Sequence, residues 1–310
     1  MLLSRVADNL YWGARYMERA DDTARVVRTF TEVLLDLPVG VASSWEPLLA
    51  VAGSRERFDA GHARANESDI VRFLVADESN PGSVVSSVAR TRENLRTTRE
   101  VLPREAWQTV NDLYLYTQRD GESGVDRRTR ARFLSRVISE AQRLDGVISG
   151  AMQRDEAYEL WRLGQAIERA DMTTRVLGVR AAALLATPPD VDDYDEVQWM
   201  GVLRSLTALQ MYQRATRGPI DGSGVVRFLL FDRQFPRSVA GCLERARSAL
   251  SRLPNPDRTM AAVDDLDRML AFLPAIADDG KLLDASMDEV QVALVRLNDV
   301  VYDTFVRAAE

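Results

Sequence analysis

The feature that most constrains the fold is an apolar stripe at the start of the chain. From Leu3 to Leu34, small or apolar residues recur at alternating intervals of three and four, the spacing of one face of an α-helix. Gly13, Ala20 and Ala24 on this stripe are small, so a second helix can approach closely. The helix should end before Pro38, because proline cannot continue it. Since no useful stretch alternates with a period of two, the sequence predicts an all-α fold.

The charged motif on this stripe occurs twice. Glu-Arg-Ala-Asp at 18–21 recurs at 168–171 with an offset of 150, and Val-Arg-Phe-Leu at 71–74 recurs at 226–229 with an offset of 155. Trp45 and Trp199 match at an intermediate offset of 154. Three matched blocks in one order indicate an internal repeat.

We therefore predict an internally duplicated helical bundle. The two pseudo-equivalent units are residues 1–150 and 151–310, packed as one body. We expect a turn containing Pro81 or Pro236 and then a long helix at about 82–101 or 237–253, with the proline at the first helical turn.

Two smaller features complete the expected organisation. Residues 53–68 are polar and read as a loop. Asp77 and Asp232 follow the Val-Arg-Phe-Leu segments, where we expect each to cap the next turn.

Composition excludes several classes of protein. The chain has 310 residues, with 40 Lys+Arg against 47 Asp+Glu and a net charge of −7. This acidic balance argues against nucleic-acid binding. No apolar run approaches the ~18 residues of a membrane span. The first residues show no secretory leader, so we expect a cytoplasmic protein.

Reactive side chains are scarce. His62, Cys242 and Lys281 are the only residues of their types, so an internal disulfide or a Cys/His zinc cluster cannot be built. There is no Gly-rich phosphate loop. The sequence therefore predicts no cofactor and no metal, and it identifies no catalytic residue.

The repeated motif is the best candidate site. On a helix, Glu18, Asp21 or Asp22, and Arg25 share one face, and so do the matched residues of the second copy. One interpretation is a structural ion-pair network that locks the helix in its bundle. The other is a site that binds a divalent ion or a cationic group, or acts as acid and base. The candidate cluster comprises Glu18, Arg19, Asp21, Asp22, Arg25, Glu168, Arg169, Asp171 and Arg175.

A second set of residues could contact a ligand. Aromatic and basic side chains precede Glu18 by one turn, although aromatics at helical spacing are usually core. An arginine in each Val-Arg-Phe-Leu segment could reach an anion, or could simply belong to a capped helix end. These candidates are Tyr11, Trp12, Arg15, Tyr16, Arg72 and Arg227.

The segment from Leu10 to Asp21, Leu-Tyr-Trp-Gly-Ala-Arg-Tyr-Met-Glu-Arg-Ala-Asp, resembles the bacterial alpha-E family, and the resemblance covers essentially the whole chain. It implies an all-helical domain with a characteristic Glu-Arg motif. It also implies gene neighbours, or fusion partners, that are circularly permuted ATP-grasp proteins and transglutaminase-like proteins. The second copy departs from the pattern, because Gln165 replaces Arg15, so the copies need not contribute equally.

Two functions follow. The first is a non-catalytic partner module for an ATP-grasp ligase and a transglutaminase-like protein. These partners would act in the synthesis or modification of peptides or amide bonds, and the module could form a homo-oligomer. The alternative is an enzyme whose duplicated motif forms a carboxylate/arginine active site or divalent-metal site. Complete pairing of the carboxylates in a closed core favours the module, whereas carboxylates facing a cleft favour the enzyme.

Overall fold

The computed structural model describes residues 2–36, 44–62, 64–186, 195–273 and 280–307, and regular structure in these residues is helical. The predicted all-α class is confirmed. The helices before residue 152 are α1 Ser4–Asp36, α2 Pro47–Val51, α3 Arg55–Gly61, α4 Glu67–Val75, α5 Val84–Arg96, α6 Arg104–Asp120 and α7 Arg130–Ala151. The later helices are α8 Glu156–Ala186, α9 Asp195–Ser205, α10 Leu209–Thr216, α11 Gly222–Phe231, α12 Val239–Leu250, α13 Asp257–Ala271 and α14 Gly280–Phe305.

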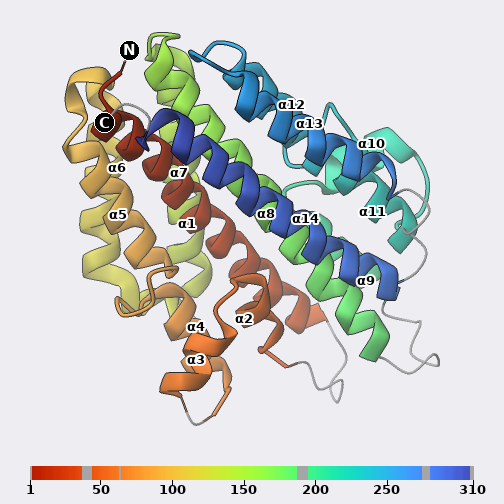
Figure 1. The fold of residues 1–310 in the computed structure, drawn as a ribbon. Helices are drawn as coiled ribbons and strands as arrows, with labels where there is room; N and C mark the ends of the chain where they lie inside the picture. Colours follow the sequence, from red (N-terminus) through yellow and green to blue (C-terminus); the bar gives the residue numbers. More distant parts are fainter. Residues whose placement is uncertain (1, 37–43, 63, 187–194, 274–279, 308–310) are drawn as a thin grey trace.

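The two longest helices, α1 and α8, lie side by side at the centre and run in the same direction (Figure 1). At their starts, the Leu2 amide donates to Glu156 Oε2 over 2.7 Å. Helices α5 and α7 pack on α1, whereas α12 and α14 pack on α8. The short helices pack on the long helix of the other half of the chain: α2 packs on α8, and α9 packs on α1. The centre of the molecule is thus the seam between α1 and α8.

Small residues allow this close approach. A Cβ atom on Gly164 of α8 would lie 2.4 Å from the Tyr11 carbonyl oxygen of α1, so only glycine fits there. Ala20 and Ala24 of α1 are fully buried. A Cβ atom on Gly13 of the α1 stripe would lie 3.5 Å from the Trp161 ring of α8, in agreement with the expected close approach of a second helix.

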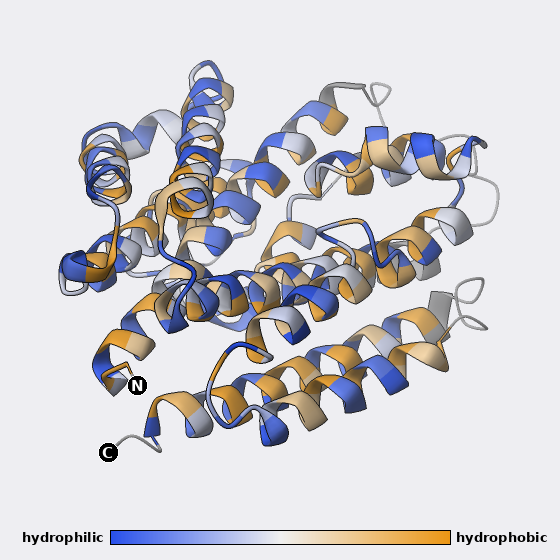
Figure 2. Ribbon diagram, turned by 90° about the horizontal axis from the view of Figure 1, so that it is seen from above, coloured by the Kyte–Doolittle hydropathy of each residue, from blue (hydrophilic) through white to orange (hydrophobic). Residues whose placement is uncertain are grey.

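Along the helices, hydrophobic and hydrophilic residues alternate instead of forming long uniform segments (Figure 2). The apolar stripes meet in one core, to which both central helices contribute, for example through Leu10 and Leu163. No helix in the described ranges is long and apolar enough to cross a membrane.

Two local predictions were wrong. The helices after Pro81 and Pro236 begin only at Val84 and Val239, so each proline lies in the preceding turn. Ser83 and Ser238 are the actual N-caps, and their hydroxyls accept backbone N–H bonds from Ser86 and Gly241. Serine ahead of the helix provides the side-chain acceptor that proline lacks.

The polar stretch 53–68 is also not a continuous loop, because it contains α3 and the start of α4. Phe58 of α3 is buried against Phe73, with ring centroids 5.2 Å apart. This single apolar anchor holds the short helix on the bundle, although its sequence is mostly polar.

The expected turn caps are confirmed. Asp77 Oδ1 accepts from the Ser79 amide over 2.8 Å. Asp232 Oδ1 accepts from the amides of Gln234 and Phe235, each over 2.8 Å. The Phe-Leu pairs ahead of them, at 73–74 and 228–229, are buried.

Candidate functional site

The two Glu-Arg motifs bind each other across the seam between α1 and α8. Arg19 Nε donates to Glu168 Oε1 over 2.6 Å, and Arg169 Nε donates to Glu18 Oε1 over 2.7 Å. Each motif therefore supplies the glutamate of one pair and the arginine of the other. Both glutamates are buried, so each requires a cationic partner.

Each glutamate has a second arginine, which comes from a different place. Arg15, one turn earlier on α1, donates to Glu168 Oε2 over 2.7 Å. Glu18 is instead paired with Arg237, whose Nη2 lies 2.9 Å from Oε1. Arg237 reaches in from the turn before α12, a region that the sequence-based candidate set did not include.

Arg237 also holds the two aspartates of the first motif. Its Nη2 donates to Asp21 Oδ2 over 2.9 Å, and its Nη1 donates to Asp22 Oδ1 over 2.6 Å. Arg25 donates to the same Asp21 oxygen over 2.9 Å and also to Thr207. Three carboxylates and three guanidinium groups thus form one buried network, with Arg169 as the third cation.

The carboxylates of this network titrate differently. Burial raises the pKa of Glu18, but the guanidinium groups of Arg169 and Arg237 outweigh burial and hold that pKa at about 2. Burial dominates for Asp22 and, with repulsion from Glu18 and Asp21, raises its pKa to about 8 despite Arg237. Burial also raises the pKa of Asp21. The network thus favours ionisation of Glu18 and disfavours ionisation of Asp22.

The matched residues of the second motif form a looser cluster. Arg175 Nε donates to Asp171 Oδ2 over 2.9 Å, and both side chains are only partly buried. Burial raises the pKa of Glu168, but Arg19 and Arg15 together lower it below its usual value. The position of Asp22 is taken by Met172, and the position of Arg237 is taken by Gly82.

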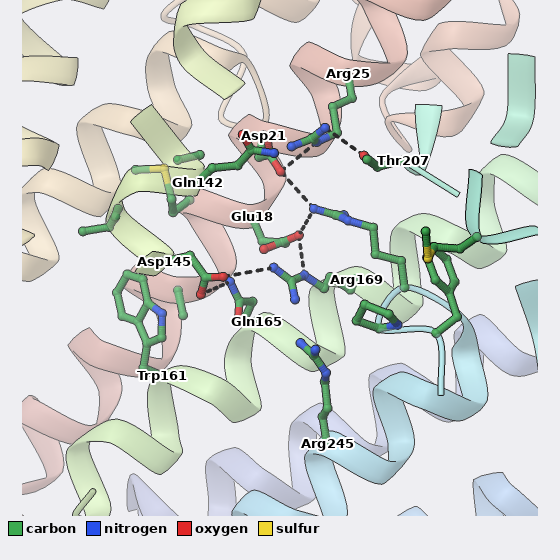
Figure 3. Close-up of a pocket in the computed structure, with 18 residues that line it drawn as sticks. Glu18, Asp21, Arg25, Gln142, Asp145, Trp161, Gln165, Arg169, Thr207 and Arg245 are labelled. Carbon is green, nitrogen blue, oxygen red and sulfur yellow. Dashed lines mark hydrogen bonds and ion pairs between the residues drawn. The ribbon is translucent and has the colours of Figure 1, made fainter. Parts of the chain in front are cut away.

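A pocket of about 410 Å³ opens beside the first network (Figure 3). Glu18, Asp21 and Arg169 form one wall of it. Trp161 and Gln165 of α8 and Asp145 of α7 line it too, together with Arg245 of α12. Gln165 Nε2 donates to Asp145 Oδ1 over 3.1 Å. The pocket therefore combines a paired ionic wall with apolar surface and further polar groups.

The two matched motifs differ at a position beside the pocket. Arg15 spans from α1 to Glu168, whereas Gln165 at the matched position is shorter and turns to Asp145. Position 165 of α8 therefore supplies no arginine to the pocket, and the α8 arginine beside Glu18 is Arg169. Near Glu168 there is a smaller hollow of about 260 Å³, which Arg19, Arg57, Asp171 and Arg175 help to line.

Several predicted ligand-contacting residues lie outside the pocket. Tyr11 is buried, and its hydroxyl donates to Asn298 Oδ1 over 2.8 Å. Trp12 lies under the Arg15 guanidinium, 4.9 Å from the ring centroid, and Tyr16 contacts Arg90. None of these aromatic side chains lines the pocket.

The two arginines of the Val-Arg-Phe-Leu segments are exposed on the surface. Arg72 pairs with Glu122, and Arg227 Nε donates to Ser223 Oγ over 3.3 Å. Neither belongs to the pocket lining.

The reactive residues His62 and Cys242 also lie outside the pocket lining. His62 stacks on Phe58 with ring centroids 4.2 Å apart. Cys242 is buried, and burial raises the pKa of its thiol to about 12.

The pocket residues that the candidate set did not include are headed by Asp145, Trp161, Arg237 and Arg245. A signal for Arg237 was present, because Asp22 has no counterpart in the other copy and neither does Arg237. Two unmatched opposite charges in one copy indicate a pair. Asp145 and Trp161 carried no such signal.

Comparison with known proteins identifies a matching family and several uncharacterised relatives. Residues 2–306 match the model of a family described as a predicted alpha-helical domain with a conserved ER motif. Uncharacterised proteins of Mycobacterium bovis and Mycobacterium tuberculosis are each 26% identical over 294 residues, covering 86% of this chain and 32% of theirs. The chain thus spans about a third of the length of these curated relatives. No solved structure gives a significant match.

Proposed function

This chain belongs to the Alpha-E family, and we propose that it is a non-catalytic helical partner module. Its partners would be an ATP-grasp ligase and a transglutaminase-like protein that together synthesise or modify peptides or other amides. In this role the chain binds and positions the ligase or its peptide substrate, and it works in the cytoplasm.

The observation that carries this proposal is that both motif glutamates are buried and paired with arginines, although Glu18 also lies in the wall of the pocket. Glu168 uses both carboxylate oxygens on Arg15 and Arg19, and Glu18 is held by Arg169 and Arg237. A general acid or base must exchange a proton with its substrate at working pH. With a pKa of about 2, Glu18 is suited to binding two helices together rather than to proton transfer.

The reactive residues support the same conclusion. The Cys242 thiol is protonated at neutral pH, because burial raises its pKa to about 12. The His62 ring stacks on the Phe58 ring, and its Nδ1 lies within hydrogen-bond distance of the Phe58 carbonyl oxygen. The greater length of the curated relatives supports a domain that acts together with other segments.

We also propose that the chain is an internal duplication of residues 1–150 and 151–310. The reciprocal pairs Arg19–Glu168 and Arg169–Glu18 support it, as does the exchange in which α2 packs on α8 and α9 on α1. Two copies related by an approximate twofold axis along the seam would make such exchanged contacts.

Co-purification tests the partnership. The tagged chain is co-expressed with a circularly permuted ATP-grasp protein of the same genome, and ATP-dependent ligation of peptides is measured with and without the chain. We expect a stable complex and a higher ligation rate, with no turnover by the chain alone. Failure to co-purify, together with an unchanged ligation rate, would overturn the proposal.

The alternative is a divalent-metal site. Oxygens of Glu18, Asp21 and Asp22 lie within 4.8 Å of one another, and one oxygen of each aspartate is buried without a hydrogen bond. However, Arg25, Arg169 and Arg237 already contact these carboxylates, so the positive charge of an ion would be opposed. A rise in melting temperature with Mn²⁺ or Mg²⁺ that Asp22→Asn abolishes would favour this alternative.

A further inference from the structure

Arg245 is the pocket residue that the network does not use. It lines the pocket and is half-buried. It makes no hydrogen bond or ion pair with any residue that the structure describes. Figure 3 shows its guanidinium directed toward Arg169, which is itself held by Glu18. A half-buried cation beside another cation, without an anion of its own, is unfavourable unless a ligand supplies one.

The other copy shows what such an arginine normally does. Arg90 occupies the position matched to Arg245, and its Nη1 donates to Tyr16 over 3.2 Å, with its guanidinium 5.3 Å from the ring centroid. The residue matched to Tyr16 is Ala166, so Arg245 has no aromatic partner. This substitution leaves its donors directed into the pocket.

The charges of the pocket favour a ligand with one negative charge. Arg25, Arg169 and Arg237 are already paired with carboxylates, so Arg245 contributes the one unneutralised guanidinium among the lining residues. Burial and repulsion from Arg169 lower the pKa of Arg245 and outweigh the attraction of Asp145, in agreement with the lack of a direct ion pair. Asp145 and Glu18 nearby would oppose a dianion such as phosphate. A carboxylate matches the fork of one guanidinium and carries one charge.

Apolar side chains line much of the rest of the pocket, beside the polar Gln142, Gln165 and Thr207. Trp161 and Leu144 lie on the α7–α8 side, and Met211 and Phe235 come from the second half of the chain. At about 410 Å³, the pocket has room for a carboxylate together with an apolar side chain.

We propose that this pocket binds the free carboxyl end of a peptide with an apolar terminal residue, and that Arg245 donates to the carboxylate. The inference rests on the proposed function, because it specifies the substrate end that the module holds.

Calorimetry on the isolated chain tests this proposal. The probes are N-acetylphenylalanine and N-acetylalanyl-phenylalanine, the amides of both, and inorganic phosphate at matched ionic strength. We expect both acids to bind about tenfold or more tightly than their amides, and more tightly than phosphate. Loss of one charge-assisted bidentate contact accounts for such a factor.

Two variants of the same helix provide the control. Arg245→Gln should weaken binding of both acids about tenfold or more, with an unchanged or higher melting temperature, because it removes a cation without a partner. Arg247→Gln, whose arginine pairs with Asp264 outside the pocket lining, should leave acid binding unchanged.

The proposal is overturned if neither acid binds, if amides or phosphate bind as well as the acids, or if Arg245→Gln binds them like the wild type. These results are distinct from a failure of the module proposal. Acid binding by a chain that does not co-purify with the ligase would contradict the partnership alone. Co-purification of a chain that binds no acid would contradict the pocket alone.

Discussion

At the scale of single residues, the network shows how a buried charge is kept only with its partner. Asp22 and Arg237 pair in the first network, while Met172 and Gly82 stand at the matched positions. Arg237 is also held by Glu18 and Asp21, whereas Asp22 pairs with Arg237, and burying that carboxylate without a cation would cost several kcal/mol. An additional arginine at 237 permits an additional carboxylate at 22.

Replacing Glu18 by Gln should destabilise the fold strongly. The change keeps the shape of the side chain but leaves Arg169 and Arg237 without their shared carboxylate. Breaking a buried pair from one side costs about 3–5 kcal/mol, measured as a lower free energy of unfolding in denaturant. The matched control is Glu93→Gln, whose carboxylate forms an exposed pair with Arg96 and whose loss should have little effect. An unchanged or higher stability of Glu18→Gln, with loss of function, would favour a catalytic site.

Replacing Asp22 by Asn should change how stability depends on pH. The carboxyl group has a pKa of about 8 in the folded protein against an ordinary value of 3.8. Its contribution to stability is therefore fully present below about pH 4 and is lost as pH rises toward about 8. Asparagine mimics the protonated form, so the variant should gain stability relative to wild type between pH 5 and pH 9. If the difference in unfolding free energy between the variant and the wild type is the same at pH 5 and at pH 9, the raised pKa is contradicted.

At the scale of helices, the ends are set by side-chain acceptors next to the chain breakers. Ser83 and Ser238 cap α5 and α12, while Asp77 and Asp232 close the turns before them. Pro81 and Pro236 lie between the helices, after the ends of α4 and α11, and do not begin the next helices. Helix identity was therefore predictable from periodicity, whereas helix starts depended on which side chain reaches a free N–H.

Replacing Asp77 by Ala should cost about 1 kcal/mol, the usual loss when a capping acceptor is removed. The loss arises because the Ser79 amide is left without its acceptor. Asp232→Ala should cost more, since two amides depend on that carboxylate. Denaturant unfolding measures both changes, with the exposed neighbour Glu78→Ala as the control. Equal stability of Asp77→Ala and wild type would refute the capping role.

At the scale of the whole molecule, the seam between α1 and α8 makes the two halves depend on each other. The glutamate–arginine pairs between the two motifs cross this seam, and Arg237 reaches α1 from the other half of the chain. Each half alone would expose the apolar face of its long helix together with charges whose partners lie elsewhere. Such a surface cannot be left in water as an independent domain.

Separate expression of residues 1–151 and 152–310 should therefore give halves that unfold without a cooperative transition. Mixed or co-expressed halves should associate as a one-to-one complex, because the whole seam is then rebuilt. Circular dichroism melts and size-exclusion chromatography provide the measurement. A half that melts cooperatively as a monomer would show that the seam is an interface between independent domains.

The sequence by itself determined the helical class and the apolar stripe, because both depend on periodicity along one helix. It also identified Glu18, Asp21 and Arg25 as one charged face, since positions three and four apart are neighbours on any helix. Only the tertiary structure decided that Glu18 meets Arg169 and Arg237. It also decided that Arg245 lines a pocket, whereas the matched Arg90 donates to Tyr16. The physical reason is that partners from distant segments depend on helix packing across the seam, which local spacing does not encode.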